Sequence, residues 1–192
     1  MDLRTFLMQS PDLSQGRSAE GFSSKWVAIG VDAKTQIVRQ GDMGADEFIL
    51  LSGALSSTIC DPEGKEVCVG LFVGPCVVMP NIARMRAGQS LVSITATTDA
   101  QFARIDSDLL TEMMIASEPV RNWANGVLRD ALSYKADREW CLAALGGSDR
   151  LKWFRETYPG YEDIFNHTLI ASFLGVTPVT LSRLRQGMRC AG

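Results

Sequence analysis

The chain changes character near Asp106, and this change limits the possible folds more than any other feature. From Gln36 to Ile105, short apolar runs are broken by Gly, Pro and Asp at spacings of about ten residues, which is typical of many short strands. From Asp106 to Leu145 there is one proline, Pro119, and few β-branched residues, which indicates helix. The sequence therefore predicts an α+β chain in which a β-domain precedes the helices.

The β-domain contains a hairpin signal. Residues 61–64, Asp-Pro-Glu-Gly, have the preferences of a type I turn and lie between the apolar runs 55–60 and 67–72. In residues 92–97 apolar and polar side chains alternate, which predicts a strand with one buried face. Before these strands, the sequence predicts a short helix over Leu3–Met8, followed by a loop rich in Ser and Gly.

A long helix is expected from about Pro119 to Leu145. Within it, one set of residues steps by four and three in strict alternation, and this set comprises Val120, Ala124, Val127, Ala131, Tyr134, Arg138, Cys141 and Leu145. Such a heptad seam suggests a helix–helix dimer, with Val120, Ala124, Val127, Ala131 and Tyr134 as the candidate seam. The alternative is a helix packed on its own β-domain, since Arg138 and the small alanines weaken a zipper. Gly146 and Gly147 then end the helix and provide a hinge.

The carboxyl end predicts two short helices separated by Gly175. Asn166 is a suitable N-cap for the first helix, and Thr177-Pro178 is a suitable start for the second. This is the pattern of a helix-turn-helix, whose second helix enters the major groove of DNA. The candidate DNA-contacting residues are Thr177, Pro178, Val179, Thr180, Ser182, Arg183, Arg185 and Gln186. Arg183 suits a base edge, whereas Arg185, Gln186 and Arg189 suit phosphates. The alternative is an ordinary helical hairpin.

Charge is distributed unevenly along the chain. The whole sequence has 19 basic and 22 acidic side chains and a net charge of −3, which alone suggests indifference to nucleic acid. Residues 164–192, however, contain three Arg and no acidic residue, so that end carries +3 and the remainder carries −6. Positive charge is thus concentrated where a DNA-binding segment requires it.

Taken as a set, these features resemble the Crp/Fnr family of bacterial transcription regulators. The resemblance covers roughly residues 20–187 and is carried by short motifs: Gln40-Gly41-Asp42, Leu51-Ser52-Gly53, the 61–66 hairpin, Ile170-Ala171-x-x-Leu174-Gly175-x-Thr177 and Leu181-Ser182-Arg183. It implies three parts. Residues 1–116 are a double-stranded β-helix (jelly-roll) sensor of the cyclic-nucleotide-binding kind, 117–146 a dimerisation helix and hinge, and 147–192 an all-α helix-turn-helix domain. The implied partners are a palindromic double-stranded DNA, a second copy of the chain and RNA polymerase.

The resemblance also identifies an altered effector pocket. In cyclic-AMP-binding members, a Gly-Glu pair holds the ribose and an Arg-Ser pair holds the cyclic phosphate. In this chain, Val78-Met79 or Met79-Pro80 occupies the first position and Ser90-Leu91 the second. Both anchoring groups are missing, and burying a phosphate without a guanidinium partner is unfavourable. We therefore expect no cyclic AMP binding of the usual kind.

Two nearby arginines leave the effector question open. Arg84 and Arg86 either reach the phosphate from another direction or are solvated loop residues. The candidate pocket residues are Val78, Met79, Pro80, Arg84, Arg86, Ser90 and Leu91. Three interpretations of this pocket remain: it binds an apolar or otherwise unrecognised small ligand, it binds no ligand, or it binds a nucleotide in an altered mode. No cofactor is expected.

The residue inventory argues against several other functions. The five cysteines form no CxxC pair, and His167 is the single histidine, so we expect no metal site and no enzyme. A cupin-like metal enzyme in particular requires several histidines in the barrel. The apolar stretch 67–83 is interrupted by Gly and Pro and the amino end shows no signal segment, so a cytoplasmic protein without a membrane partner is expected. The rival function is a ligand-binding or protein-interaction module whose helix-turn-helix no longer reads DNA.

Overall fold

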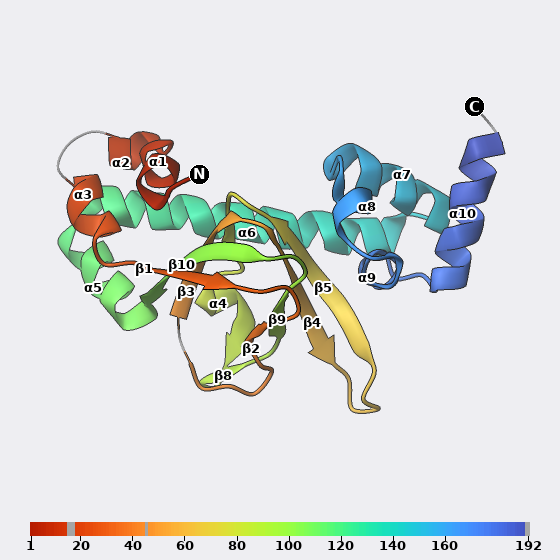
Figure 1. The fold of residues 1–192 in the computed structure, drawn as a ribbon, viewed down its shortest axis with the longest axis horizontal. Helices are drawn as coiled ribbons and strands as arrows, with labels where there is room; N and C mark the ends of the chain where they lie inside the picture. Colours follow the sequence, from red (N-terminus) through yellow and green to blue (C-terminus); the bar gives the residue numbers. More distant parts are fainter. Residues whose placement is uncertain (15–17, 45, 191–192) are drawn as a thin grey trace.

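The computed structural model describes residues 1–14, 18–44 and 46–190. Three short helices come first, followed by a β-sandwich, one long helix and a group of helices at the carboxyl end (Figure 1). The long helix, α6, extends from the side of the amino-terminal helices to the carboxyl-terminal helices and contacts both the latter and the β-sandwich (Figure 1). The expected order of a β-domain followed by helices is therefore confirmed.

The β-sandwich consists of two four-stranded antiparallel sheets. The first has the order β1 (Val27–Val31), β10 (Ala100–Asp106), β3 (Asp46–Ser52) and β6 (Cys76–Val78). The second has the order β2 (Gln36–Val38), β9 (Ser93–Ala96), β4 (Ala54–Cys60) and β5 (Glu66–Val73). A small hairpin of β7 (Met85–Arg86) and β8 (Gln89–Ser90) follows the helix α4 (Asn81–Arg84).

Strand β3 is buried on both faces, which sets the layering of the domain. Because alternate side chains of a strand point to opposite faces, Phe48 and Leu50 enter the core between the two sheets. Ile49 points the other way and packs against helices, in a second core that includes Trp123 of α6. One sheet of the sandwich is therefore covered by helices on its outer face.

The local motifs of the β-domain fold as the sequence predicts. Gly64 donates its amide to the carbonyl of Asp61 at 3.0 Å, which closes the turn of the β4–β5 hairpin. Ile94 and Ala96 are buried on one face of β9, and Val92 is buried just before it. The side chain of Asp106 accepts from two amides at the start of α5 (Ser107–Ala116), so the expected helix cap is also present.

The amino-terminal region differs from the prediction. Helix α1 (Leu3–Met8) is confirmed, but the expected loop contains two further helices, α2 (Pro11–Ser14) and α3 (Ser18–Ser23). Leu7, Leu13 and Phe22 are fully buried in the core that α6 shares with the sheet. These helices are too short to show a period, and tertiary packing rather than local pattern stabilises them.

Helix α6 (Glu118–Ala144) begins and ends near the predicted positions, and residues of its heptad seam pack within the chain. Val120 and Ala124 are buried in the core beneath the helix, and the Tyr134 hydroxyl contacts β5. Part of the candidate dimer seam therefore packs on the β-domain of the same chain, and a helix–helix dimer through this seam stays a prediction. A monomer-stabilising face and a dimer face have the same spacing in sequence, so periodicity alone does not separate them.

The carboxyl-terminal helices are α7 (Gly147–Thr157), α8 (Tyr161–Ile164), α9 (His167–Phe173) and α10 (Pro178–Cys190). They are held together by a cluster of packed aromatic rings, which comprises Trp153, Phe154, Tyr158, Tyr161, Phe165 and Phe173. Tyr134 of α6 joins this cluster, so the helical unit packs directly on the long helix.

Candidate nucleic-acid interface and effector pocket

Helices α9 and α10 meet at a tight turn that the local sequence specifies. The Asn166 side chain accepts from the Leu169 amide at 2.9 Å, and the Thr177 hydroxyl accepts from the Thr180 amide at 3.1 Å, so each helix has its expected cap. Gly175 has a φ of +64°, and a Cβ there would lie 3.0 Å from Leu142. Both the conformation and the space require glycine at this turn.

One face of α10 is exposed to solvent. Val179, Ser182, Arg183 and Gln186 are exposed and follow each other at steps of three, one and three residues, so they lie on a single face of the helix. The guanidinium of Arg183 makes no hydrogen bond or ion pair with a described residue. Thr177 and Pro178 are exposed at the start of the helix, whereas Thr180 is partly buried and its hydroxyl bonds that of Thr177. Among its described residues, this face therefore offers one free cation, Arg183, and several short polar groups.

Arg185 does not belong to this face. Its guanidinium pairs with the Glu162 carboxylate at 2.8 Å and donates to Nδ1 of His167 at 2.8 Å. With Nδ1 accepting, Nε2 of His167 carries the proton and donates to the carbonyl of Pro178 at 2.7 Å. Arg185 thus connects α8, α9 and α10 through internal contacts, and the phosphate contact expected of it stays a prediction.

Glu162 is the common partner of two arginines in this network. It accepts from Arg155 at 2.5 Å as well as from Arg185. Burial alone raises the pKa of Glu162, but the hydrogen bonds and charges of the two arginines outweigh burial and lower it. Glu162, which lies two residues before the basic segment 164–192, therefore holds Arg185 in place. The side chain of Arg189 lies outside the described residues.

The helical unit is fastened to the open edge of the sandwich. Strand β5 is the edge strand of its sheet. On its open side, backbone groups form hydrogen bonds with side chains instead of with another strand. The Cys68 amide donates to the Ser172 hydroxyl of α9 at 2.8 Å, and Arg138 of α6 donates to the Cys68 carbonyl at 3.0 Å. Arg138 also donates to the Phe173 carbonyl at 3.2 Å. These contacts join the β-domain, α6 and α9 in one network.

The predicted effector-pocket residues lie in two environments. Val78, Met79 and Pro80 are buried at the end of β6, and the Ser90 hydroxyl is buried and donates to the Val92 carbonyl at 2.8 Å. Met79 and Leu91 line a cavity of about 600 Å³ that α6 covers. Val78, Pro80 and Ser90 are not among its lining residues. The cavity therefore combines part of the predicted set with side chains of α6 that sequence reasoning missed.

Two cations of α6 reach this cavity, and both have carbonyl partners. Lys135 donates to the Ala83 carbonyl at 2.7 Å, and burial lowers the pKa of this lysine. Arg138 is held by the carbonyls of Cys68 and Phe173. Lys135 and Arg138 are three residues apart on α6, so the sequence places them on one side of the helix. The sequence does not indicate that this side faces the β-domain.

Arg84 is buried, which corrects the interpretation of it as a solvated loop residue. It is 1% exposed, donates to the Asp46 carbonyl and lies 5.4 Å from the centre of the Phe48 ring. Neither Arg84 nor the exposed Arg86 lines the cavity under α6. Burial lowers the pKa of Arg84, while the nearby Glu47 carboxylate raises it. Arg84 is therefore part of the packed interior of the β-domain.

Two further observations concern the described part of the chain. None of its helices has the length and apolar character needed to cross a membrane. Within the same residues, His, Cys, Asp and Glu side chains do not gather in groups of three or more with the geometry of a metal site.

Comparison with known proteins supports this description of the fold. Residues 30–117 match the family model of the cyclic nucleotide-binding domain. No curated protein matches the chain by sequence. Among solved structures, FixK2 from Bradyrhizobium japonicum is similar over 87% of this chain and 86% of its own, with a TM-score of 0.73 and 14% identity.

Two other solved structures show the same arrangement. CLP from Xanthomonas campestris, a global regulator responsive to c-di-GMP, covers 91% of this chain and 92% of its own, with a TM-score of 0.71 and 17% identity. A protein from Eubacterium rectale assigned to the Crp/Fnr regulators covers 95% and 88%, with a TM-score of 0.71 and 21% identity. At these identities the likeness establishes the fold, in which a cyclic nucleotide-binding β-domain is joined to carboxyl-terminal helices.

Proposed function

We propose that the chain is a dimeric, sequence-specific DNA-binding transcription regulator of the Crp/Fnr type and not an enzyme. The observation that carries this proposal is the exposed face of α10, where Arg183 has no internal partner beside Val179, Ser182 and Gln186. A second helix of this kind, capped at Thr177 and fixed on α9, is the geometry that enters a major groove. The solved structures of regulators with the same fold support the assignment.

We place the dimer contact on the outward face of α6. Leu132 is 66% exposed and Trp140 is 56% exposed, although both lie in a helix whose other face is buried. Ile115, in the adjacent α5, is 77% exposed. Large exposed apolar side chains on two neighbouring helices are typical of an interface. A second copy packed there in two-fold symmetry would present two copies of α10 to a palindromic site.

The sensor pocket is proposed to lack cyclic AMP binding of the usual kind. A cyclic phosphate needs a bidentate donor to offset its desolvation, and the two cations of α6 at the cavity are already held by carbonyls. Arg84, a buried guanidinium near this region, points to Asp46 and Phe48 instead. An effector that relies on a phosphate anchor is therefore disfavoured.

The test is a selection from random duplex DNA with the full-length chain, followed by binding of the enriched sequence at several salt concentrations. We expect an inverted repeat with half-sites about one helical turn apart, bound at least a thousandfold tighter than random DNA. We also expect the affinity to fall steeply with salt. If no sequence is enriched and binding to all DNA is weak, the chain is instead a ligand-binding or protein-interaction module.

A further inference from the structure

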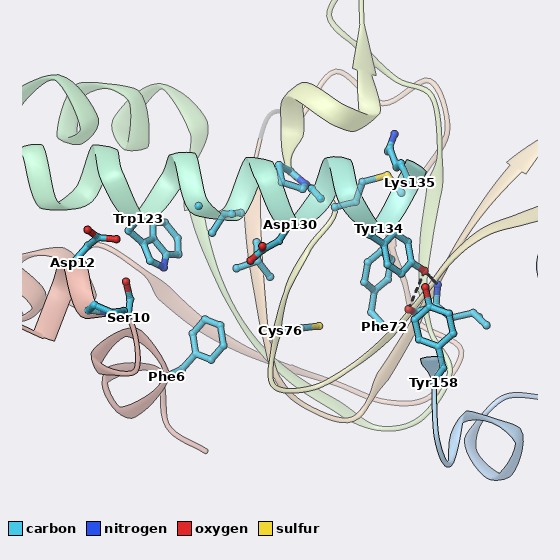
Figure 2. Close-up of a pocket in the computed structure, with 18 of the residues that line it drawn as sticks. Phe6, Ser10, Asp12, Phe72, Cys76, Trp123, Asp130, Tyr134, Lys135 and Tyr158 are labelled. Atoms are coloured by element: carbon cyan, nitrogen blue, oxygen red, sulfur yellow. Dashed lines mark hydrogen bonds between the residues drawn. The ribbon is translucent and has the colours of Figure 1, made fainter. Parts of the chain in front are cut away.

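A second cavity lies beneath α6, on the side that faces the amino-terminal helices. Its volume is about 570 Å³, and it is bounded by α6, the α1–α2 segment, strands β5 and β6, and the residues around α8 (Figure 2). Its walls are rich in aromatic rings, contributed by Phe6, Phe72, Trp123, Tyr134, Tyr158 and Tyr161. The volume is in the range of sites that hold a small organic molecule.

Small residues on α6 create this space. Gly126 and Ala131 line the cavity in a part of the helix where larger side chains would fill it. A Cβ added at Gly126 would have no atom within 4 Å. Glycine within a helix is unfavourable, and no close packing or positive φ requires it at this position. The chain thus keeps an open apolar space at a position where alanine would stabilise the helix.

The charge at the cavity is negative. Among its described lining residues, Asp12 and Asp130 are the acids and Lys135 is the only cation. Figure 2 shows Asp130 on the lower side of α6, towards Phe6 and Cys76, whereas Lys135 points to the other side of the helix. Lys135 is held there by the Ala83 carbonyl. Asp130 makes no hydrogen bond or ion pair with a described residue.

We propose that this cavity binds a small aromatic or apolar cation, with its ring among the aromatic walls and its ammonium group beside Asp130. Aromatic faces attract cations, and an unpaired carboxylate at the cavity adds a charged partner. The same features disfavour an anion, so this site is chemically unlike a cyclic-nucleotide pocket. Tyr134 and Tyr158 belong both to this cavity and to the contact between α6 and the carboxyl-terminal helices. Bound ligand therefore touches that contact directly; an effect on DNA binding rests on the proposed function, whereas ligand binding does not.

Three probes of equal length test the charge preference. Calorimetric titration of the full-length chain with 4-phenylbutylamine, 4-phenylbutanol and 4-phenylbutyrate compares a cation, a neutral molecule and an anion. We expect the amine to bind at least tenfold tighter than the alcohol, and the carboxylate to bind weakest. Equal affinities, or no binding of the amine at millimolar concentration, would overturn the proposal.

Three variants locate the binding. Asp130→Asn should remove most of the preference for the amine over the alcohol, and the part that remains comes from the aromatic rings and Asp12. Gly126→Phe should abolish binding of both, while the matched control Gly126→Ala, which leaves most of the space open, should retain the preference for the amine. Circular dichroism melting checks that each variant is folded. Amine binding that survives Gly126→Phe in a folded protein, or a charge preference that Asp130→Asn leaves unchanged, would contradict the assignment. None of these readouts involves DNA, so they are independent of the proposed regulator function.

Discussion

The hydroxyl of Tyr134 on α6 accepts from the amide of Leu71 at 3.0 Å and donates to the carbonyl of the same residue at 3.2 Å. One side chain thus satisfies both free backbone groups of a residue in the edge strand β5 (Figure 2). An unpaired strand edge is a site for unwanted pairing, and α6 closes it at this point. The contact also fixes the long helix, which carries the outward apolar face, to the β-domain.

Removal of the Tyr134 hydroxyl should therefore cost more than one ordinary surface hydrogen bond. In Tyr134→Phe the ring can still stack on Phe72, whose centre lies 5.7 Å away, but the amide and carbonyl of Leu71 lose their partner. We expect the free energy of unfolding to fall by about 1–3 kcal/mol. Urea unfolding measures this, and faster hydrogen exchange at the Leu71 amide locates it. Unchanged exchange at Leu71 would show that the hydroxyl does not protect the strand edge.

Arg183 and Arg185 are two residues apart, but replacing each by alanine should have different effects on DNA binding and on stability. Arg183→Ala removes an exposed group without a partner, so we expect unfolding to change by less than about 0.5 kcal/mol. Binding to the selected DNA should weaken by about 1–3 kcal/mol, with relaxed preference at one base pair. Equal losses on selected and random DNA would leave Arg183 with a phosphate contact only.

Arg185→Ala should act on the fold of the helical unit instead. It removes the ion pair with Glu162 and the hydrogen bond to His167, which together join three helices. We expect the free energy of unfolding to fall by about 1 kcal/mol, and selected and random DNA to be affected alike. Paired urea unfolding and DNA titration of the two variants decide this. A stable Arg185→Ala protein with a loss confined to selected DNA would return Arg185 to the DNA-contacting set.

The sequence predicted those parts of the structure that local chemistry determines. The turn at Asp61–Gly64, the caps at Asp106, Asn166 and Thr177, and the glycine at position 175 each depend on residues within a few positions, and all of them form. The length of α6 followed in the same way from the absence of helix breakers.

The parts that the sequence missed depend on distant contacts. Nothing near Arg84 indicates that its guanidinium reaches back to Asp46, and nothing near Arg185 indicates that Glu162 and His167 are its partners. The heptad on α6 showed that one face is apolar, but not whether it covers the sandwich or a second copy. The cavity beside Asp130 is lined by segments far apart in the chain, so no local sequence pattern predicts it.

The outward face of α6 makes a prediction about oligomeric state. Leu132→Glu places a charge on the proposed dimer contact without touching the protomer core, because Leu132 is 66% exposed. We expect the dimer dissociation constant to rise at least tenfold while the protomer keeps its thermal stability. Met43→Glu is a matched control, since Met43 is 73% exposed in the loop after β2. Sedimentation velocity over a range of concentrations measures both. A Leu132→Glu dimer as tight as the unsubstituted protein would exclude this face as the contact.

Glu47 should make the β-domain less stable as pH rises. Burial raises the pKa of Glu47 to about 7, although its carboxylate accepts from the Asn81 amide at 2.8 Å and lies near the positive charge of Arg84. A carboxyl group whose pKa is higher in the folded than in the unfolded state favours folding while it is protonated. That contribution is complete below the ordinary pKa of 4.5 and is lost as pH rises through about 7.

Glu47→Gln removes this dependence because the amide is neutral at every pH and its oxygen still accepts from Asn81. Between pH 4.5 and pH 7.5, the stability of the unsubstituted protein relative to Glu47→Gln should fall by about 3 kcal/mol. Urea unfolding of both proteins across this range measures the difference. A constant difference would mean that Glu47 ionises in the folded protein as it does in the unfolded chain. Arg84, whose charge lies beside Glu47, would then compensate for the cost of burying the carboxylate.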